Sequence, residues 1–138
     1  MKIGVVLVTH YGLGREFLQA LRLIIPDAPD YAAVSLDPAQ SVEAMRESIE
    51  SAIAGANSGD GVLVLTDMFG GTPSNLALSF LNDHSIEVVT GINLPMLIKL
   101  ATGPADLPLD ELAVFLKEYG QRNISVASQL LPSEGNKK

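Results

Sequence analysis

The sequence predicts an α/β protein built on an open, mainly parallel sheet of about four strands, with helices on both faces. Apolar runs at residues 5–8 and 62–65 show no alternation, which is typical of strands buried on both faces. Between such runs, apolar residues recur at helical spacing. Strands that alternate with helices favour a parallel sheet, because each strand is then joined to the next by a crossover helix.

The individual elements follow from these patterns in chain order. We expect strands in the apolar run that ends at His10 and at residues 31–36, 62–65 and 86–90. Apolar stripes mark three helices: Phe17, Leu21 and Ile24; then Val42, Met45, Ile49 and Ile53; and, within residues 109–119, Leu112, Phe115 and Leu116. A shorter helix is expected at about residues 93–102.

Capping residues and prolines predict where the helices begin and end. Pro26 and Pro29 end the first helix. Ser41 is a suitable N-cap for the second. Thr72 and Pro73 predict the start of the third, with Thr72 as the cap and Pro73 at the first helical position.

We expect the first and third strands to be neighbours, with the second strand outside the first, which gives the order 2-1-3-4. The right-handed crossover rule leaves few other arrangements. Residues 124–127 are predicted to form an antiparallel edge strand. Residues 1–130 therefore form a single domain, and residues 131–138 form a polar, disordered tail.

Composition excludes several functions. The chain has 138 residues, of which 47% are hydrophobic, so it can form a proper core. Its net charge of −7, without a basic cluster, argues against nucleic-acid binding. We find no membrane span, signal peptide, metal-binding spacing or nucleotide-binding loop, and we expect no metal and no cofactor. The absence of cysteine suits a cytoplasmic protein.

His10 and Asp67 lie at the ends of two strands that we expect to be neighbours. In open parallel sheets, ligands bind at the carboxyl ends of the strands, where the strand order reverses. A carboxylate that accepts a hydrogen bond from one ring nitrogen leaves the other nitrogen with a free lone pair. The pair therefore predicts a nucleophilic histidine, His10, that is oriented by Asp67.

The turn after the third strand predicts an anion-binding site beside this pair. Gly70 and Gly71 leave the backbone bare, so an anion can approach the N–H groups closely. The helix that follows presents its N-terminus to the same place, and helix N-termini favour anions. The hydroxyls of Thr72 and Ser74 can either cap the helix or bind phosphoryl oxygens. Together these residues indicate a histidine that accepts a phosphoryl group.

The chain resembles the IIA components of the mannose family of the bacterial phosphoenolpyruvate-dependent sugar phosphotransferase system (PTS). The resemblance covers residues 1–126. It rests on five separated motifs in the right order: Val8-Thr9-His10, Val34-Ser35-Leu36, residues 60–67, Phe69-Gly70-Gly71-Thr72-Pro73-Ser74-Asn75 and residues 91–96.

The resemblance implies that His10 is the phosphorylated histidine, that Asp67 orients it, and that residues 70–72 form the phosphoryl-binding loop. We add Thr9, Phe69 and Ser74 to the predicted phosphoryl-binding residues. The implied donor is the phosphocarrier protein HPr, and the implied acceptor is a IIB domain. The family is usually dimeric with an exchanged C-terminal strand, and it can associate indirectly with the membrane through IIC and IID components.

One departure from the family pattern concerns the residue after the histidine, which is usually Gly and here is Tyr11. Other functions also stay open at this point. The chain could be a stand-alone regulatory phosphoprotein, a phosphotransfer subunit of dihydroxyacetone kinase, a receiver-like domain or a binding module. A receiver-like domain needs an acidic pair after the first strand, where this chain has Thr9-His10-Tyr11.

Overall fold

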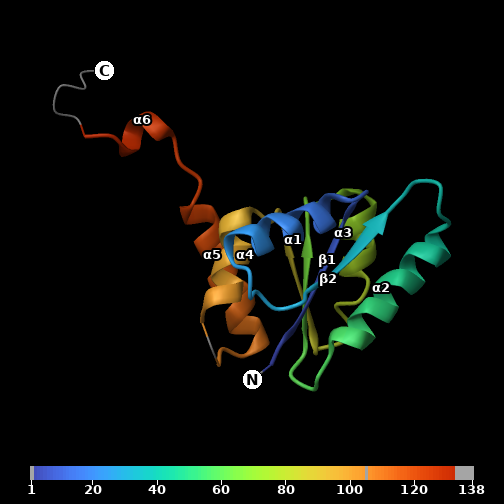
Figure 1. Cartoon of the computed structure of the whole chain (residues 1–138). Helices are drawn as coiled ribbons and strands as arrows, with labels where there is room; N and C mark the ends of the chain where they lie inside the picture. Colours follow the sequence, from blue (N-terminus) through green and yellow to red (C-terminus); the bar gives the residue numbers. More distant parts are fainter. Residues whose placement is uncertain (1, 105, 133–138) are drawn as a thin grey trace.

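The structure, a computed structural model, describes residues 2–104 and 106–132 and contains one four-stranded parallel sheet (Figure 1). The strand order is β2-β1-β3-β4, as predicted. The strands are β1 (Gly4–His10), β2 (Ala32–Leu36), β3 (Val62–Thr66) and β4 (Ile86–Thr90). The order reverses between β1 and β3, so the carboxyl ends of these two strands flank the point at which a binding site is expected.

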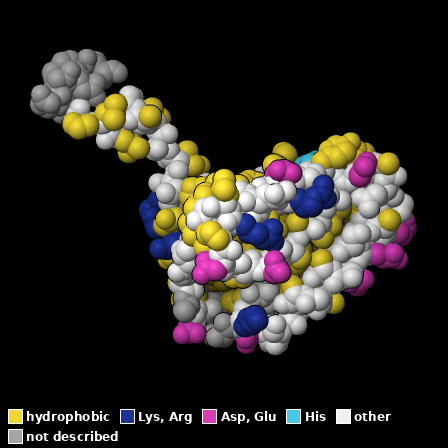
Figure 2. Space-filling model, in the orientation of Figure 1, with side chains coloured by type: hydrophobic (Ala, Val, Ile, Leu, Met, Phe, Trp, Pro, Cys, Tyr) yellow, Lys and Arg dark blue, Asp and Glu magenta, His cyan; other side chains and the backbone are white. Residues whose placement is uncertain are grey.

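Helices cover both faces of the sheet, also as predicted (Figure 1). They are α1 (Leu13–Ile24), α2 (Val42–Ala56), α3 (Gly71–Leu78), α4 (Leu94–Thr102) and α5 (Leu109–Arg122). A further short helix, α6 (Ala127–Leu130), lies beyond α5 and projects away from the sheet (Figure 1 and Figure 2). One core lies between the sheet and α1, α4 and α5, and a second lies between the sheet and α2 and α3. Within the described residues, no helix is both long and apolar enough to cross a bilayer.

The central strands contribute side chains to both cores, which explains their uninterrupted apolar sequence. In β1, Val5 and Leu7 enter the first core, whereas Val6 and Val8 enter the second. All five residues of β3 are buried. Burial of each such side chain stabilises the fold by about 1.5–3 kcal/mol. The two strands that end at the predicted site are therefore anchored in both cores.

The predicted helices differ from the observed ones mainly at their ends. Ile24 and Val42 are half-exposed because they are the last residue of α1 and the first of α2, so neither faces the sheet. Leu18 takes the buried position in α1 instead. Ser41 does cap α2, and its hydroxyl accepts the Ala44 N–H at 3.1 Å.

Thr72 does not cap α3, contrary to the prediction. The helix begins two residues earlier than predicted, at Gly71, and Gly70 is the N-cap. Gly70 and Gly71 both have positive φ angles, +89° and +82°, so they form the turn that leads into the helix. Thr72 consequently lies within the first turn, where its side chain makes no capping hydrogen bond.

The predicted edge strand at residues 124–127 does not form within the single chain, and its exchange in a dimer stays a prediction. Residues 124–126 belong to no strand, and α6 begins at Ala127. The segment leads away from the sheet beyond α5 (Figure 1), so it reaches neither free edge and cannot complete a ladder. Its larger apolar residues are exposed: Ile124, Val126, Leu130 and Leu131. Of the predicted tail, residues 133–138 lie outside the described part of the chain.

Candidate active site

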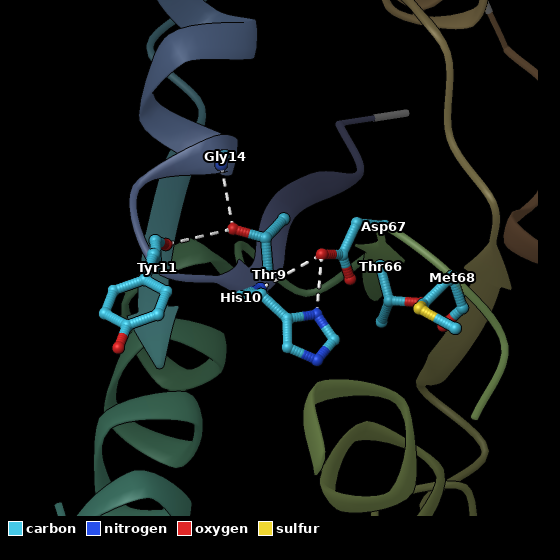
Figure 3. A network of polar contacts seen from close by, with 7 residues as sticks. All are labelled: Thr9, His10, Tyr11, Gly14, Thr66, Asp67 and Met68. Carbon is cyan, nitrogen blue, oxygen red and sulfur yellow. Dashed lines mark hydrogen bonds and ion pairs between the residues drawn. The ribbon is translucent and has the colours of Figure 1, made fainter. Parts of the chain in front are cut away.

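His10 and Asp67 meet at the carboxyl edge of the sheet, where β1 and β3 end side by side (Figure 3). His10 is the last residue of β1, and Asp67 follows the last residue of β3. One carboxylate oxygen, Asp67 Oδ2, accepts the His10 backbone N–H at 3.1 Å and lies 2.9 Å from the His10 ring nitrogen Nδ1. The two residues are thus held together by both main chain and side chain.

These contacts determine the tautomer of the ring. An ionised carboxylate can only accept hydrogen bonds, so Nδ1 carries the proton and Nε2 keeps its lone pair. The His10 side chain is 48% exposed and the Asp67 side chain only 9%. The second carboxylate oxygen of Asp67, Oδ1, is buried without a hydrogen-bond partner among the described residues. The pair therefore combines a largely buried carboxylate with a half-exposed imidazole ring.

The free nitrogen of His10 faces the start of α3. A Cβ atom placed on Gly71 would lie 3.3 Å from both Cε1 and Nε2 of the ring. The unpaired N–H groups of a helix N-terminus attract anions. A phosphoryl group bonded to Nε2 would consequently lie against the first turn of α3, where the missing side chain of Gly71 leaves room for it.

The other predicted phosphoryl-binding residues differ in accessibility. Gly70 is the N-cap of α3, and Thr72 is exposed in its first turn. The Ser74 hydroxyl is fully buried and has no hydrogen-bond partner in the described structure. Phe69 is 72% exposed. Thr9 is fully buried, and its hydroxyl contacts main-chain groups of residues 11 and 14.

Tyr11 adopts a backbone conformation that suits glycine. Its φ angle is +46°, in the left-handed region that disfavours bulky side chains. The Tyr11 N–H is bonded to the Leu36 carbonyl at 3.0 Å, which holds the turn after β1 against the end of β2. The tyrosine thus keeps the turn that a glycine would make and adds a ring that is 60% exposed.

Sequence reasoning did not identify the role of Thr66. It is fully buried at the end of β3, and its hydroxyl donates to the Met68 carbonyl at 3.3 Å. The sequence does contain a signal for this contact, because a threonine immediately precedes each residue of the pair, in Thr9-His10 and in Thr66-Asp67.

Comparisons with known proteins agree with this fold and give the family of the chain. The family described as the PTS system fructose IIA component, EIIA-man, matches residues 4–116. The chain is 28% identical over 126 residues to the mannose-specific EIIAB component of Escherichia coli K12, covering 90% of this chain and 39% of the relative. It is 28% identical over 130 residues to the fructose-specific EIIA component of Bacillus subtilis, covering 94% and 89%.

Among solved structures, a mannose/sorbose-specific IIA subunit from Enterococcus faecalis superposes with a TM-score of 0.82 at 30% identity, covering 91% of this chain and 95% of that one. The chain therefore belongs to the mannose family of PTS EIIA components. It spans about two fifths of the length of the E. coli relative, which carries the description EIIAB.

Proposed function

We propose that this protein is a phosphoryl carrier of a sugar phosphotransferase system, with the phosphoryl group held on Nε2 of His10. The observation that carries the proposal is the Asp67 carboxylate 2.9 Å from Nδ1, because it leaves Nε2 as the nucleophile. The placement of Nε2 against the start of α3 supports the same assignment.

The transfer step balances without a metal or a cofactor. The Nε2 lone pair attacks the phosphorus of the donor's phosphohistidine and forms a new P–N bond. The donor's P–N bond breaks, and its electron pair returns to the donor's ring nitrogen. The His10 ring becomes cationic, and the adjacent Asp67 carboxylate stabilises that charge. Transfer to the acceptor reverses these changes.

The surroundings of His10 suit a protein partner. Tyr11, Met68 and Phe69 are 60%, 52% and 72% exposed at the edge of the sheet that carries the histidine. Exposed apolar groups of this kind are enriched where proteins associate. We infer that HPr is the donor and a IIB domain the acceptor, and that the protein acts in the cytoplasm, with membrane association only through IIC and IID components.

We further propose a homodimer in which the C-terminal segment takes part. The exposed side chains of Ile124, Val126, Leu130 and Leu131 support this assignment, because a single chain leaves them in water. Sedimentation of the full chain and of a chain ending at Asn123 tests it. We expect a dimer for the first and a monomer for the second, and a full chain that sediments as a monomer would contradict the proposal.

Reconstitution tests the phosphoryl-carrier assignment. The protein is mixed with phosphoenolpyruvate, enzyme I and HPr, and the labelled residue is mapped by mass spectrometry. We expect one label on His10 that is labile in acid and stable in base, as a phosphoramidate is, and no label on His10→Ala. A His10→Ala protein that is still labelled, or an acid-stable label on a hydroxyl such as that of Thr72, would overturn the assignment.

A further inference from the structure

Each residue of the His10–Asp67 pair lies in a local structure of the same kind. Thr9 and Thr66 are fully buried at the ends of β1 and β3. The Thr9 hydroxyl donates to the Tyr11 carbonyl and the Thr66 hydroxyl to the Met68 carbonyl, each at 3.3 Å (Figure 3). We call these two contacts the Thr9 clasp and the Thr66 clasp. His10 is the middle residue of the Thr9 clasp, between Thr9 and Tyr11, and Asp67 is the middle residue of the Thr66 clasp, between Thr66 and Met68.

The Thr9 clasp also fixes the start of α1. The Thr9 hydroxyl oxygen accepts the Gly14 N–H at 2.8 Å. Gly14 packs so closely that a Cβ atom on it would lie 3.3 Å from that oxygen. One hydroxyl therefore joins the end of β1, the left-handed turn at Tyr11 and the first turn of α1.

Thr66 also contacts the segment that follows β4 through its main chain. The Thr66 carbonyl accepts the Gly91 N–H at 3.0 Å and the Ile92 N–H at 3.2 Å. The Thr66 carbonyl thus holds the segment after β4, and the Thr66 hydroxyl holds the loop after β3. These contacts fix the direction in which Asp67 leaves β3.

A threonine at a strand end does not make such a contact automatically. Thr90 is the last residue of β4 and is in register with Thr66. Within the described structure, the Thr90 hydroxyl makes no hydrogen bond to the carbonyl two residues further on, that of Ile92. The clasps occur on the two neighbouring strands that carry the reacting pair.

We propose that Thr9 and Thr66 are positioning residues for phosphoryl transfer, which set the alignment of the His10 ring against Asp67. The inference rests on the proposed function of His10. Both contacts between the loop of His10 and the loop of Asp67 go to one oxygen atom, Asp67 Oδ2, so a shift of either loop changes the geometry of both contacts. Misplacement of a reacting group by about 1 Å can lower a rate by about 100-fold.

Variants that differ by one hydroxyl test the proposal. Thr9→Val and Thr66→Val keep the shape of the side chain and remove the donor, and Thr90→Val is the matched control. In single-turnover transfer from phospho-HPr, we expect the first two to be about 10- to 100-fold slower with little change in the half-saturating HPr concentration. Thr90→Val, Thr9→Ser and Thr66→Ser should transfer at rates close to that of the unaltered protein.

Nitrogen NMR of the His10 ring gives a readout that does not depend on phosphorylation. We expect a single Nδ1–H tautomer in the unaltered protein and in both serine variants, and a mixture of tautomers in both valine variants. Removing the Thr9 hydroxyl leaves the Gly14 N–H without its partner, whereas removing the Thr66 hydroxyl leaves no backbone N–H without one. Thr66→Val is therefore the decisive variant if Thr9→Val does not fold.

The outcomes separate this inference from the proposed function. The positioning role would be overturned if Thr9→Val and Thr66→Val had the same transfer rate and the same His10 tautomer as Thr90→Val. It would also be overturned if the two serine variants transferred as slowly as the two valine variants. Failure of phospho-HPr to label His10 in the unaltered protein would instead overturn the proposed function, and the tautomer measurement would still decide whether the clasps orient the ring.

Discussion

At the scale of single residues, two contacts to one oxygen govern the reactivity that we expect of His10. Asp67 Oδ2 accepts the His10 N–H and faces Nδ1, so an asparagine whose amide oxygen takes the place of Oδ2 could keep both contacts but not the charge. A carboxylate that orients a histidine also stabilises the cationic ring formed on attack. The side chain consequently matters more for the reaction than for the fold.

Asp67→Asn is expected to fold normally and to accept the phosphoryl group on the order of 100-fold more slowly. The amide keeps the size of the carboxylate but cannot balance the positive charge of the phosphorylated ring. Rapid-quench measurement of transfer from phospho-HPr, beside a circular dichroism spectrum, checks both parts. A normal rate would show that Asp67 does not assist the transfer.

Gly71→Ala is expected to combine backbone strain with a block at Nε2. The φ angle of +82° disfavours alanine, and the new methyl group would lie 3.3 Å from the ring. Gly70→Ala is the matched control, because its φ angle is +89° and nothing lies within 4 Å of the added atom. We expect each variant to lose about 1–2 kcal/mol of unfolding free energy in urea.

Transfer kinetics then separate the two glycine variants. Gly71→Ala should transfer about tenfold or more slowly than Gly70→Ala, since only its methyl group occupies the space beside Nε2. Equal rates would place the transferred phosphoryl group away from the start of α3.

At the scale of elements, Asn93 joins α4 and α5, two of the three helices that cover one side of the sheet. Its Oδ1 atom caps α4 by accepting the Met96 N–H at 3.1 Å, and its Nδ2 atom donates to the Gly120 carbonyl in α5 at 3.1 Å. A Cβ atom on Gly120 would lie 2.6 Å from Met96 Sδ, so the helices are in close contact there.

Substitutions at Asn93 should separate its two roles. Asn93→Ser keeps a capping oxygen but cannot reach α5, and it is expected to lose about 1 kcal/mol of unfolding free energy. Asn93→Ala loses both contacts and should cost about 2 kcal/mol. Urea denaturation measures both values, and equal losses for the two variants would mean that the cap contributes nothing.

At the scale of the whole molecule, partial burial of Tyr31 against the core between the sheet and α1, α4 and α5 links stability to pH. Burial raises the pKa of Tyr31 from 10.0 to about 12. The unfolded chain therefore loses this proton at a lower pH than the folded one. The contribution of Tyr31 to stability is fully present below pH 10 and is lost as the pH rises towards about 12.

Tyr31→Phe removes this dependence, because phenylalanine has no proton to lose. The free energy of unfolding, measured in urea from pH 8 to pH 12, should fall more steeply for the unaltered protein than for the variant above pH 10. The other lysines and tyrosines are shared by both proteins and cancel in the comparison. Parallel curves would contradict the effect of burial.

The order of elements and the pairing of His10 with Asp67 were predictable because their signals are local. A strand buried on both faces must be apolar throughout, as residues 62–65 are, and a parallel sheet brings the carboxyl ends of its strands to one edge. The start of α3 was misplaced because the positive φ angles of Gly70 and Gly71 depend on the turn as a whole.

The fold class and the candidate pair of His10 and Asp67 could be predicted from the sequence, because hydrophobic periodicity and strand ends are recognisable in neighbouring residues. The strand order was predictable with the help of the crossover rule, which leaves few arrangements. The packed chain was needed to show which ring nitrogen contacts Asp67, that the Nε2 atom faces Gly71, and that two threonine hydroxyls contact the loops that carry the pair. It also decided that residues 124–127 form no strand in the single chain. These outcomes depend on distances between atoms that are remote in sequence, which only the packed chain brings together.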